Sequence, residues 1–285
     1  MKQRRYLVPL FYCVTVIILL LPSILFGQSD KNLKLGNPSN AKADTTMHDN
    51  YLMEKPQYCL SYNNTKHIPN WVSWHVDSTD LGKKDRQNDF RADNSLPATW
   101  YHVVTPKDYK NSGFDKGHQC PSGDRTNSVV NNSATFLMTN MIPQAPKNNQ
   151  QTWKGLEDYS RSLVKQGNEL YIICGICGQG GIGSKNKTDM VIGSGVVVPA
   201  QTWKIIVVVP VKNPQIDTST RIITVLMPNT QDCAKQPWYN YRTSIDSLEQ
   251  LTGYNFLSNI PIDIQKTLEA KIDTLPIKNK TIINQ

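Results

Sequence analysis

Four apolar stretches dominate the pattern of hydrophobic and polar positions in the second half of the chain. They read ELYIIC, MVIGSGVVVP, TWKIIVVVP and RIITVLMP, and lie between residues 169 and 228 with Gly, Asn and Pro residues between them. Each stretch is short and rich in β-branched residues, which is typical of buried strands. No helical period separates them, and consecutive strands without crossover helices favour an antiparallel sheet.

Further strands are expected earlier in the chain. QYCLSY and WVSWHV both have strand character, and the turn residues of NNTKHIPN between them predict a β-hairpin with a longer loop. TFLMTNMIPQ, residues 135–144, is expected to be a buried strand that runs into a turn.

Two segments have helical patterns. In the first, apolar or small residues recur with the 3.6-residue period at Trp153, Leu156, Ser160, Leu163 and Val164. Gly167 is suited to end this helix. The second helix is expected from Ser244 to Thr252, because a Ser/Asp-rich cap begins it and Gly253 ends it.

The remaining sequence divides the chain. Residues 1–27 are a basic start followed by an apolar run, which predicts a signal peptide and therefore a secreted or periplasmic protein. The alternative is an uncleaved membrane anchor. Residues 28–50 are polar without periodicity and are expected to form a flexible leader, and residues 273–285 a C-terminal tail. One domain of residues 51–272 is expected between them, with loops from about residue 83 to 121.

Charge and cysteine content add little to this picture. The net charge is +8, and because Lys2, Arg4 and Arg5 contribute three of these charges, the chain after the predicted signal carries +5. This mild basic bias is consistent with a polyanionic partner. Outside the signal segment the cysteines are Cys59, Cys120, Cys174, Cys177 and Cys233. An odd number allows at most two disulfides, and the sequence does not determine the pairing.

The first candidate site surrounds His118 in FDKGHQCPSGDR, residues 114–125. A neutral imidazole accepts a proton near pH 7, and Gly117 lets a substrate or metal approach the backbone closely. Lys116 and Arg125 bring positive charge to this loop. A single loop histidine is more often a surface residue than a catalyst, so this pattern needs a second signal.

The second signal lies in NMIPQAPKNNQQTWKGLEDYSR. Asn148 and Asn149 precede the predicted helix, and Glu157 and Arg161 are four residues apart on its surface. One interpretation is an i,i+4 ion pair with Asn149 as the N-cap. The other is a hard-cation site, in which amide and carboxylate oxygens hold Mg²⁺ and an arginine contacts a phosphate.

Four motifs together resemble one family. FDKGHQCPSGDRTNS, FLMTNMIPQAPKNNQQTWKGLEDYSR, KPQYCLSY followed by PNWVSWHV, and DRQNDFRAD are similar to motifs of the DNA/RNA non-specific endonucleases. The resemblance is strongest to secreted cyanobacterial sugar-nonspecific nucleases and weaker to mitochondrial endonuclease G. It covers about residues 33–273. It implies an α+β, ββα-metal (His-Me finger) nuclease fold with a central antiparallel sheet flanked by helices.

The resemblance also implies roles for individual residues. His118 matches the general base that activates water. Asn149 matches the one side chain that binds the metal directly, and Glu157 matches the carboxylate that holds metal-bound waters. Asn140 matches an asparagine that supports the site. Mg²⁺ or Mn²⁺ is expected rather than Zn²⁺, which prefers several His or Cys ligands.

The same resemblance assigns Arg86 and Arg161 to the phosphate. At the position of the family's arginine before the glycine this chain has Lys116, which keeps the charge but lacks the bidentate guanidinium. The implied function is metal-dependent hydrolysis of DNA and RNA to 5′-phosphate products. A monomer is expected, with no membrane partner after signal removal, and the sequence does not identify a protein inhibitor.

Three alternatives point to other classes of protein. GQGGIGSK, residues 178–185, resembles a phosphate-binding loop but has the wrong residue order and is followed by turn and strand residues. CGIC, residues 174–177, suggests a thiol-disulfide oxidoreductase, but no helix is predicted after it. The third alternative is a secreted nucleic-acid-binding protein on an inactive nuclease scaffold; His118, Asn149 and Glu157 argue against it, because a binder needs only basic residues.

Overall fold

The computed structural model describes residues 29–100 and 103–277. The predicted signal peptide, residues 1–27, therefore lies outside the described residues. Within the described ranges, no helix combines the length and the apolar character needed to span a bilayer.

A six-stranded sheet forms the centre of the molecule, in the order β1-β2-β3-β6-β11-β12. Every neighbouring pair is antiparallel, as the pattern of apolar stretches predicted. The strands are β1 Tyr51–Lys55, β2 Tyr58–Asn63, β3 Ile68–Val76, β6 Asn168–Cys177, β11 Gln201–Pro210 and β12 Arg221–Pro228. The predicted hairpin is β2 and β3.

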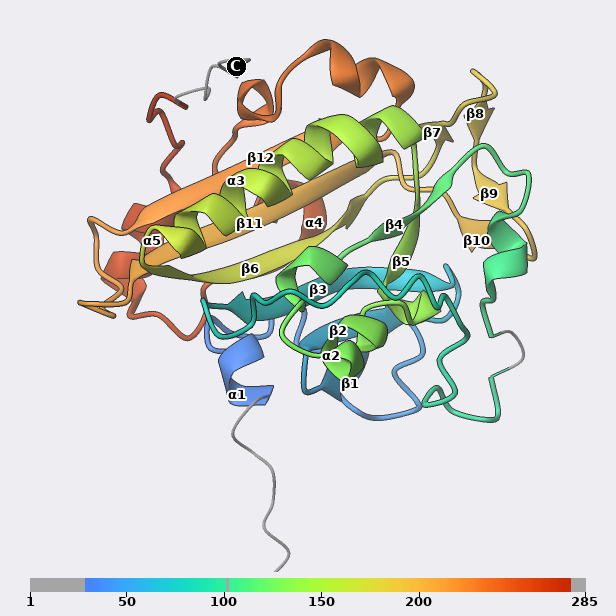
Figure 1. The fold of residues 1–285 in the computed structure, drawn as a ribbon, viewed down its shortest axis with the longest axis horizontal. Coiled ribbons are helices and arrows are strands. Elements are labelled where there is room, and N and C mark those ends of the chain that lie inside the picture. The colour runs from blue at the N-terminus through green and yellow to red at the C-terminus, as the bar shows by residue number, and fades with distance from the viewer. Residues whose placement is uncertain (1–28, 101–102, 278–285) are drawn as a thin grey trace, which may run out of the picture.

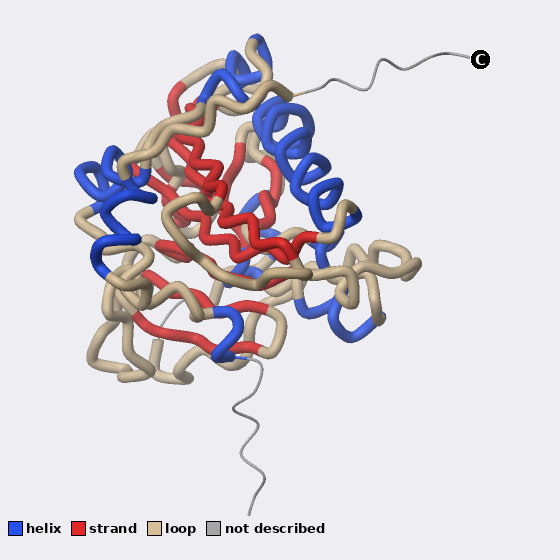
Figure 2. The backbone as a smooth tube through the Cα atoms, turned by 90° about the vertical axis from the view of Figure 1, so that its left-hand side faces the viewer, coloured by secondary structure: helices blue, strands red, loops and turns tan. Residues whose placement is uncertain are grey.

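Helices cover both faces of this sheet, as Figures 1 and 2 show. α3 (Lys154–Lys165) packs on one face, where Leu156, Leu163 and Val164 join the apolar cluster of the strands. α4 (Ile245–Thr252) and α5 (Ile262–Glu269) pack on the other face. Short helices are α1 (Ser29–Asn32) and α2 (Val129–Ala134).

The two predicted helices are confirmed with their ends. Gly167 follows α3 with a φ of 90°, and Gly253 ends α4 in the left-handed region with a φ of 71°. The hydroxyl of Ser244 accepts a hydrogen bond from the backbone N–H of Ser247, which caps α4 as the sequence indicated.

Two predicted strands are wrong in extent. In residues 135–144 only β5 (Met141–Gln144) is a strand, because Met138–Asn140 forms a 3₁₀ turn. The stretch 190–199 folds back on itself as β9 (Val191–Ile192) and β10 (Val196–Val197), since Gly193 and Gly195 adopt positive φ between them. The remaining short strands are β4 (Asp115–His118), β7 (Gly181–Ile182) and β8 (Thr188–Asp189).

The segment expected to be a flexible leader is packed against the sheet from Asn32 on. Leu35 and Ala41 are buried in the cluster on the α4 side, and the Trp71 indole donates to Ser39. The early part of the expected tail is also held, because Arg221 and Arg242 both contact the carboxylate of Asp273. These contacts need the folded sheet, so local sequence composition did not reveal them.

Candidate active site

A ββα unit builds the site. β4 pairs with β5 in antiparallel register, so that Gly117 lies opposite Ile142 and His118 opposite Met141. The chain then passes through a π-helical turn, Asn148–Trp153, into α3. The end of β4 and the start of α3 thereby border one cleft of about 410 Å³. The cleft is lined by Arg86, Lys116, His118, Pro121, Ser122, Gly123, Thr126, Asn132, Asn149, Gln150, Lys154, Glu157 and Arg161.

His118 is buried at the edge of this cleft, with 7% of its surface exposed. The rings of Phe90 and Phe136 contact its imidazole edge to face, with centroids 5.5 and 4.8 Å away. Its Nε2 atom is buried and has no hydrogen-bond partner in the protein. A buried polar atom without a partner is costly and is typical of a group that meets a ligand or water.

Burial, and then the positive charges of Arg86 and Lys116, lower the pKa of His118 from 6.5 to about 3. The imidazole is therefore neutral at pH 7 and able to accept a proton. Arg86 and Lys116 line the same cleft, so the charges that keep His118 neutral are also available to an anion.

The lowered pKa predicts a pH-dependent stability. The unfolded chain takes up a proton on this imidazole below pH 6.5, whereas the folded chain does not until about pH 3. The free energy of unfolding should therefore fall between these pH values, by about 2 kcal/mol at pH 5. Urea unfolding at pH 7.5 and at pH 5 measures this change. Between these pH values the free energy of unfolding should decrease by about 2 kcal/mol less in His118→Gln than in the parent protein. Equal decreases in the two proteins would contradict the lowered pKa.

Asn149 lies in the π-helical turn and does not cap α3 as the N-cap interpretation expected; residue 153 occupies that position. Its side-chain Nδ2 donates to Asp115 Oδ2 at 2.8 Å. Gln150 donates to the same oxygen at 2.8 Å. Since the NH₂ group of Asn149 is held by Asp115, its amide oxygen is the atom available to a cation in the cleft.

The donor atoms of the cleft fit a hard, hydrated cation. The Asn149 amide oxygen and the Glu157 carboxylate are oxygen donors of the kind that Mg²⁺ and Mn²⁺ prefer. Among the described residues that line the cleft, His118 is the single histidine and no cysteine occurs, which does not suit Zn²⁺.

Glu157 and Arg161 both reach the cleft, but each has its ion-pair partner elsewhere. The Glu157 carboxylate lies 3.7 Å from Lys204 Nζ of β11. Arg161 donates to Asp124 Oδ1 at 2.9 Å and to Asp158 Oδ1 at 2.6 Å. The interpretation as an isolated i,i+4 surface pair is therefore wrong. Burial raises the pKa of Glu157, and the charges of Lys204 and Arg161 oppose this effect.

Arg86 and Lys116 also line the cleft, and their charges act on His118. Arg86 donates to Ser122 Oγ at 2.7 Å, and its guanidinium lies 4.8 Å from the centre of the Phe136 ring. The Lys116 ammonium lies 4.7 Å from the centre of the Phe90 ring. The aromatic faces thus support both cations next to His118.

Asn140 does not line the cleft; it is fully buried beneath it. Its side-chain carbonyl accepts from the Cys120 N–H, and its NH₂ group donates to the carbonyls of Cys120 and Thr135, all at 2.9 Å. The Asn140 carbonyl accepts from the Gln119 N–H at 3.0 Å. These bonds fix the two residues that follow His118.

Gly117 is required by the close pairing of β4 and β5. A Cβ atom at this position would lie 2.6 Å from Cβ of Gln144. Gly117→Ala should therefore lower the free energy of unfolding by about 1–3 kcal/mol. The matched control is Gly155→Ala in α3, where the new Cβ lies 3.5 Å from Trp238 and should stabilise the helix by about 0.5–1 kcal/mol. Thermal or urea unfolding measures both, and equal stabilities would contradict the prediction.

Three residues were not identified from the sequence. Asp115 holds Asn149, Asp124 holds Arg161, and Lys204 contacts Glu157. Asp115 and Asp124 both lie in the FDKGHQCPSGDR segment. The signal for Lys204 was a single charge within the apolar strand TWKIIVVVP.

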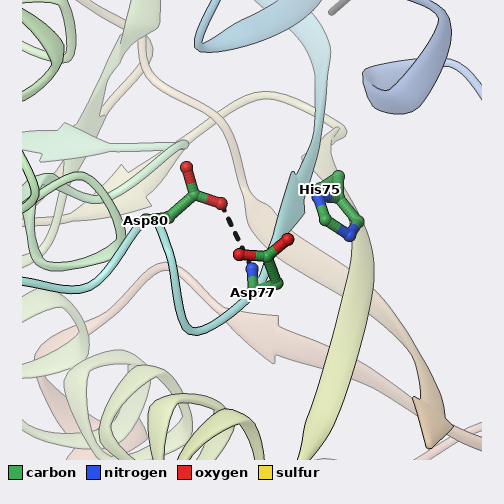
Figure 3. Close-up of side chains that lie close together, drawn as sticks. All are labelled: His75, Asp77 and Asp80. Atoms are coloured by element: carbon green, nitrogen blue, oxygen red, sulfur yellow. Dashed lines mark hydrogen bonds between the residues drawn. The ribbon is translucent and has the colours of Figure 1, made fainter. Parts of the chain in front are cut away.

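A second group of potential ligands lies outside the cleft. Figure 3 shows His75, Asp77 and Asp80, whose ligand atoms all lie within 4.8 Å of one another. Their atoms already have partners: Asp77 accepts from the N–H and hydroxyl of Thr79, Asp80 accepts from the Asp77 N–H, and His75 Nε2 is 2.8 Å from Glu169. A further acidic group consists of Asp246, Glu249 and Glu269. We assign no metal to either group.

The rival motifs have structural explanations. The glycine-rich segment 178–185 contains the start of the β7–β8 hairpin and no helix follows it. CGIC is the end of strand β6, so it lacks the helix N-terminus that a redox-active pair needs. All five described cysteines are free thiols.

The antiparallel sheet with its ββα unit gives the chain the fold of the ββα-metal nucleases, and one cleft brings together His118, Asn149 and Glu157. The chain belongs to the DNA/RNA non-specific endonuclease family, whose sequence model matches residues 35–263.

Individual relatives support this assignment. A nuclease of Nostoc sp. is 49% identical over 245 residues, covering 85% of this chain and 86% of the relative. Human mitochondrial endonuclease G is 32% identical over 215 residues, covering 73% of this chain and 70% of the relative. A chain in a crystal structure of an EndoG/EndoGI complex has the same fold, with a TM-score of 0.68 and 24% identity over 82% of this chain and 93% of that chain.

Proposed function

We propose that this protein is an exported, metal-dependent endonuclease that hydrolyses phosphodiester bonds of both DNA and RNA and leaves 5′-phosphate products. The observation that carries the proposal is the cleft itself, which is lined by a neutral His118 together with Asn149, Glu157 and four cations. A nucleic-acid-binding protein needs only the cations, so the histidine favours the enzyme.

In the proposed reaction, the imidazole of His118 takes the proton of the attacking water. The lowered pKa of His118 keeps the imidazole unprotonated at neutral pH. The edge-to-face contacts with the rings of Phe90 and Phe136 fix the orientation of the imidazole ring. The hydrogen bonds of Asn140 fix the chain that follows it. The residue is therefore preorganised as a general base.

Asn149 would hold Mg²⁺ or Mn²⁺ directly, with Asp115 orienting its amide, and Glu157 would hold the waters of the ion. When bound, the ion supplies stabilisation of the negative charge on the phosphate and on the departing 3′ oxygen. Asp115 has the position of an outer residue that orients a ligand.

The phosphate would be bound by Arg86, Arg161 and Lys116. Arg161 is fixed by Asp124 and Asp158, and Arg86 by Ser122. Contacts to phosphate carry no base information, so such a cleft accepts DNA and RNA with little sequence preference. Lys116 offers a point charge without a bidentate fork, so we assign the oriented phosphate contacts to the two arginines.

The proposal is tested by release of acid-soluble nucleotides from plasmid DNA and from RNA by the purified chain from residue 28 on, with Mg²⁺, with Mn²⁺ and with EDTA. Turnover of both substrates that EDTA abolishes is expected, together with 5′-phosphate ends on the products. Salt-sensitive DNA binding without turnover under any divalent ion would instead support the binding-protein alternative. N-terminal sequencing of protein recovered outside the cytoplasm tests the predicted removal of residues 1–27.

A further inference from the structure

Lys204 is a fully buried cation under the cleft, with 1% of its surface exposed. It lies in the middle of β11, between Cys174 of β6 and Val225 of β12. On the same strand, Ile206 and Val208 belong to the apolar cluster under α3, and the strand period of two places Lys204 on that face. A buried charge is expensive unless it is paired, so its retention here requires a partner.

That partner is the carboxylate of Glu157. Lys204 Nζ lies 3.7 Å from Glu157 Oε1 and 4.1 Å from the centre of the Trp153 ring. The centre of the Trp74 ring lies 5.5 Å from the same Nζ atom. Two indole faces therefore hold the ammonium in place by cation–π attraction, and Trp153 directly precedes the helix that carries Glu157.

Trp74 is also part of the support of Arg161, through Asp124. The Trp74 indole N–H donates to Asp124 Oδ2 at 3.0 Å, while Asp124 Oδ1 accepts from Arg161 at 2.9 Å. Asp124 is itself 2% exposed. Arg161 and Glu157 of α3 thus each have a buried countercharge: Asp124 for Arg161 and Lys204 for Glu157.

We propose that Lys204 is a positioning residue of the active site, which holds the Glu157 side chain and its negative charge toward the cleft from beneath. The inference rests on the proposed function, because it assigns Glu157 to the hydrated metal ion. Lys204 itself does not line the cleft. Its effect on the reaction passes through Glu157 alone.

The charges around Glu157 come from three elements. Lys204 approaches from β11, Arg161 and Asp158 from α3, and Asp124 from the turn Ser122–Asp124. The two cations favour the carboxylate and the two aspartates disfavour it. Removing Lys204 leaves Arg161 as the remaining cation of this set, and Arg161 is already bonded to Asp124 and Asp158.

The test is Lys204→Met, which keeps the length and apolar stem of the side chain but removes the charge. We expect Mn²⁺ binding, measured by electron paramagnetic resonance without substrate, to weaken by about 10–100-fold, as for other residues that orient a metal site. The matched control is Thr202→Val, two residues earlier in β11 and equally buried, which should leave the Mn²⁺ affinity within twofold of the parent protein.

A double-mutant cycle separates positioning from general packing. In a Glu157→Gln background, Lys204→Met is expected to change Mn²⁺ affinity and kcat by less than twofold, because its target is already neutral. Equal losses in both backgrounds, or an unchanged Mn²⁺ affinity in the single variant, would overturn the proposal. If Lys204→Met alone does not fold, recovery of folding in the double variant supports the coupling, and failure of both to fold contradicts it.

This experiment is separate from the test of nuclease activity. A parent protein that binds Mn²⁺ but releases no nucleotides would contradict the proposed function, while the Mn²⁺ affinities would still decide whether Lys204 acts through Glu157.

Discussion

Replacing His118 with glutamine is expected to lower kcat on DNA and on RNA by about 10²–10⁴-fold, the usual contribution of a general base. Glutamine keeps a polar side chain of similar length but accepts no proton near pH 7. Because the Nε2 atom of His118 lacks a partner in the protein, the substitution removes no internal hydrogen bond from that atom. Initial rates at saturating Mg²⁺ and substrate measure the effect.

Binding and folding should be unchanged in this variant. DNA affinity in EDTA should stay within a few-fold, since the cations of the cleft remain, and the far-ultraviolet circular dichroism should match that of the parent protein. His48→Ala is the matched control, because His48 is exposed and does not line the cleft. A kcat for His118→Gln within tenfold of the parent value would exclude His118 as the base.

Replacing Asn149 with alanine is the second substitution with a large expected effect. The change removes the proposed metal-binding oxygen. It should lower activity at millimolar Mg²⁺ by about 10³-fold. It should also weaken Mn²⁺ binding measured by calorimetry. The Asp115 carboxylate keeps its hydrogen bond from Gln150, so the turn before α3 retains one of its two bonds to β4.

Gln150→Ala is the matched control for this variant. Gln150 donates to the same Asp115 oxygen at the same distance of 2.8 Å and borders the same cleft. Its loss should reduce activity by less than about tenfold, the lower end of the effect of an outer residue of a metal site. Similar losses in the two variants would show that the hydrogen bond to Asp115, and not a metal contact of Asn149, carries the effect.

Local sequence was sufficient for elements whose signals lie within a few residues. The apolar period of α3, its end at Gly167 and the cap and end of α4 were all predicted, because helices form from neighbouring residues. The antiparallel sheet followed from consecutive apolar stretches without helices between them. Residues 135–144 were predicted as one strand, but Met138–Asn140 is a 3₁₀ turn. The side chain of Asn140 bonds Cys120, twenty residues earlier in the chain, and composition alone does not show such a contact.

Motif spacing also located the main residues of the site. His118 lies on β4, and Asn149, Glu157 and Arg161 lie within one turn-and-helix segment, so their order in the sequence nearly fixes their order around the cleft. Arg86 is more than thirty residues from His118 in the sequence. Its place beside Phe136 and Ser122 depends on how a long loop packs, and only the family resemblance pointed to it.

The sequence by itself thus determined the antiparallel sheet and the two main helices, because these depend on local periodicity. The family resemblance of its short motifs pointed to His118 as the proposed base and to Asn149 as the proposed metal-binding residue. Only the tertiary structure decided which charges pair: Arg161 with Asp124 instead of Glu157, and Glu157 with Lys204 on a strand 47 positions away in the sequence. The physical reason is that strand alternation places Lys204 on one face of β11 but does not say what covers that face. The packing of α3 on that face brings Glu157 to Lys204.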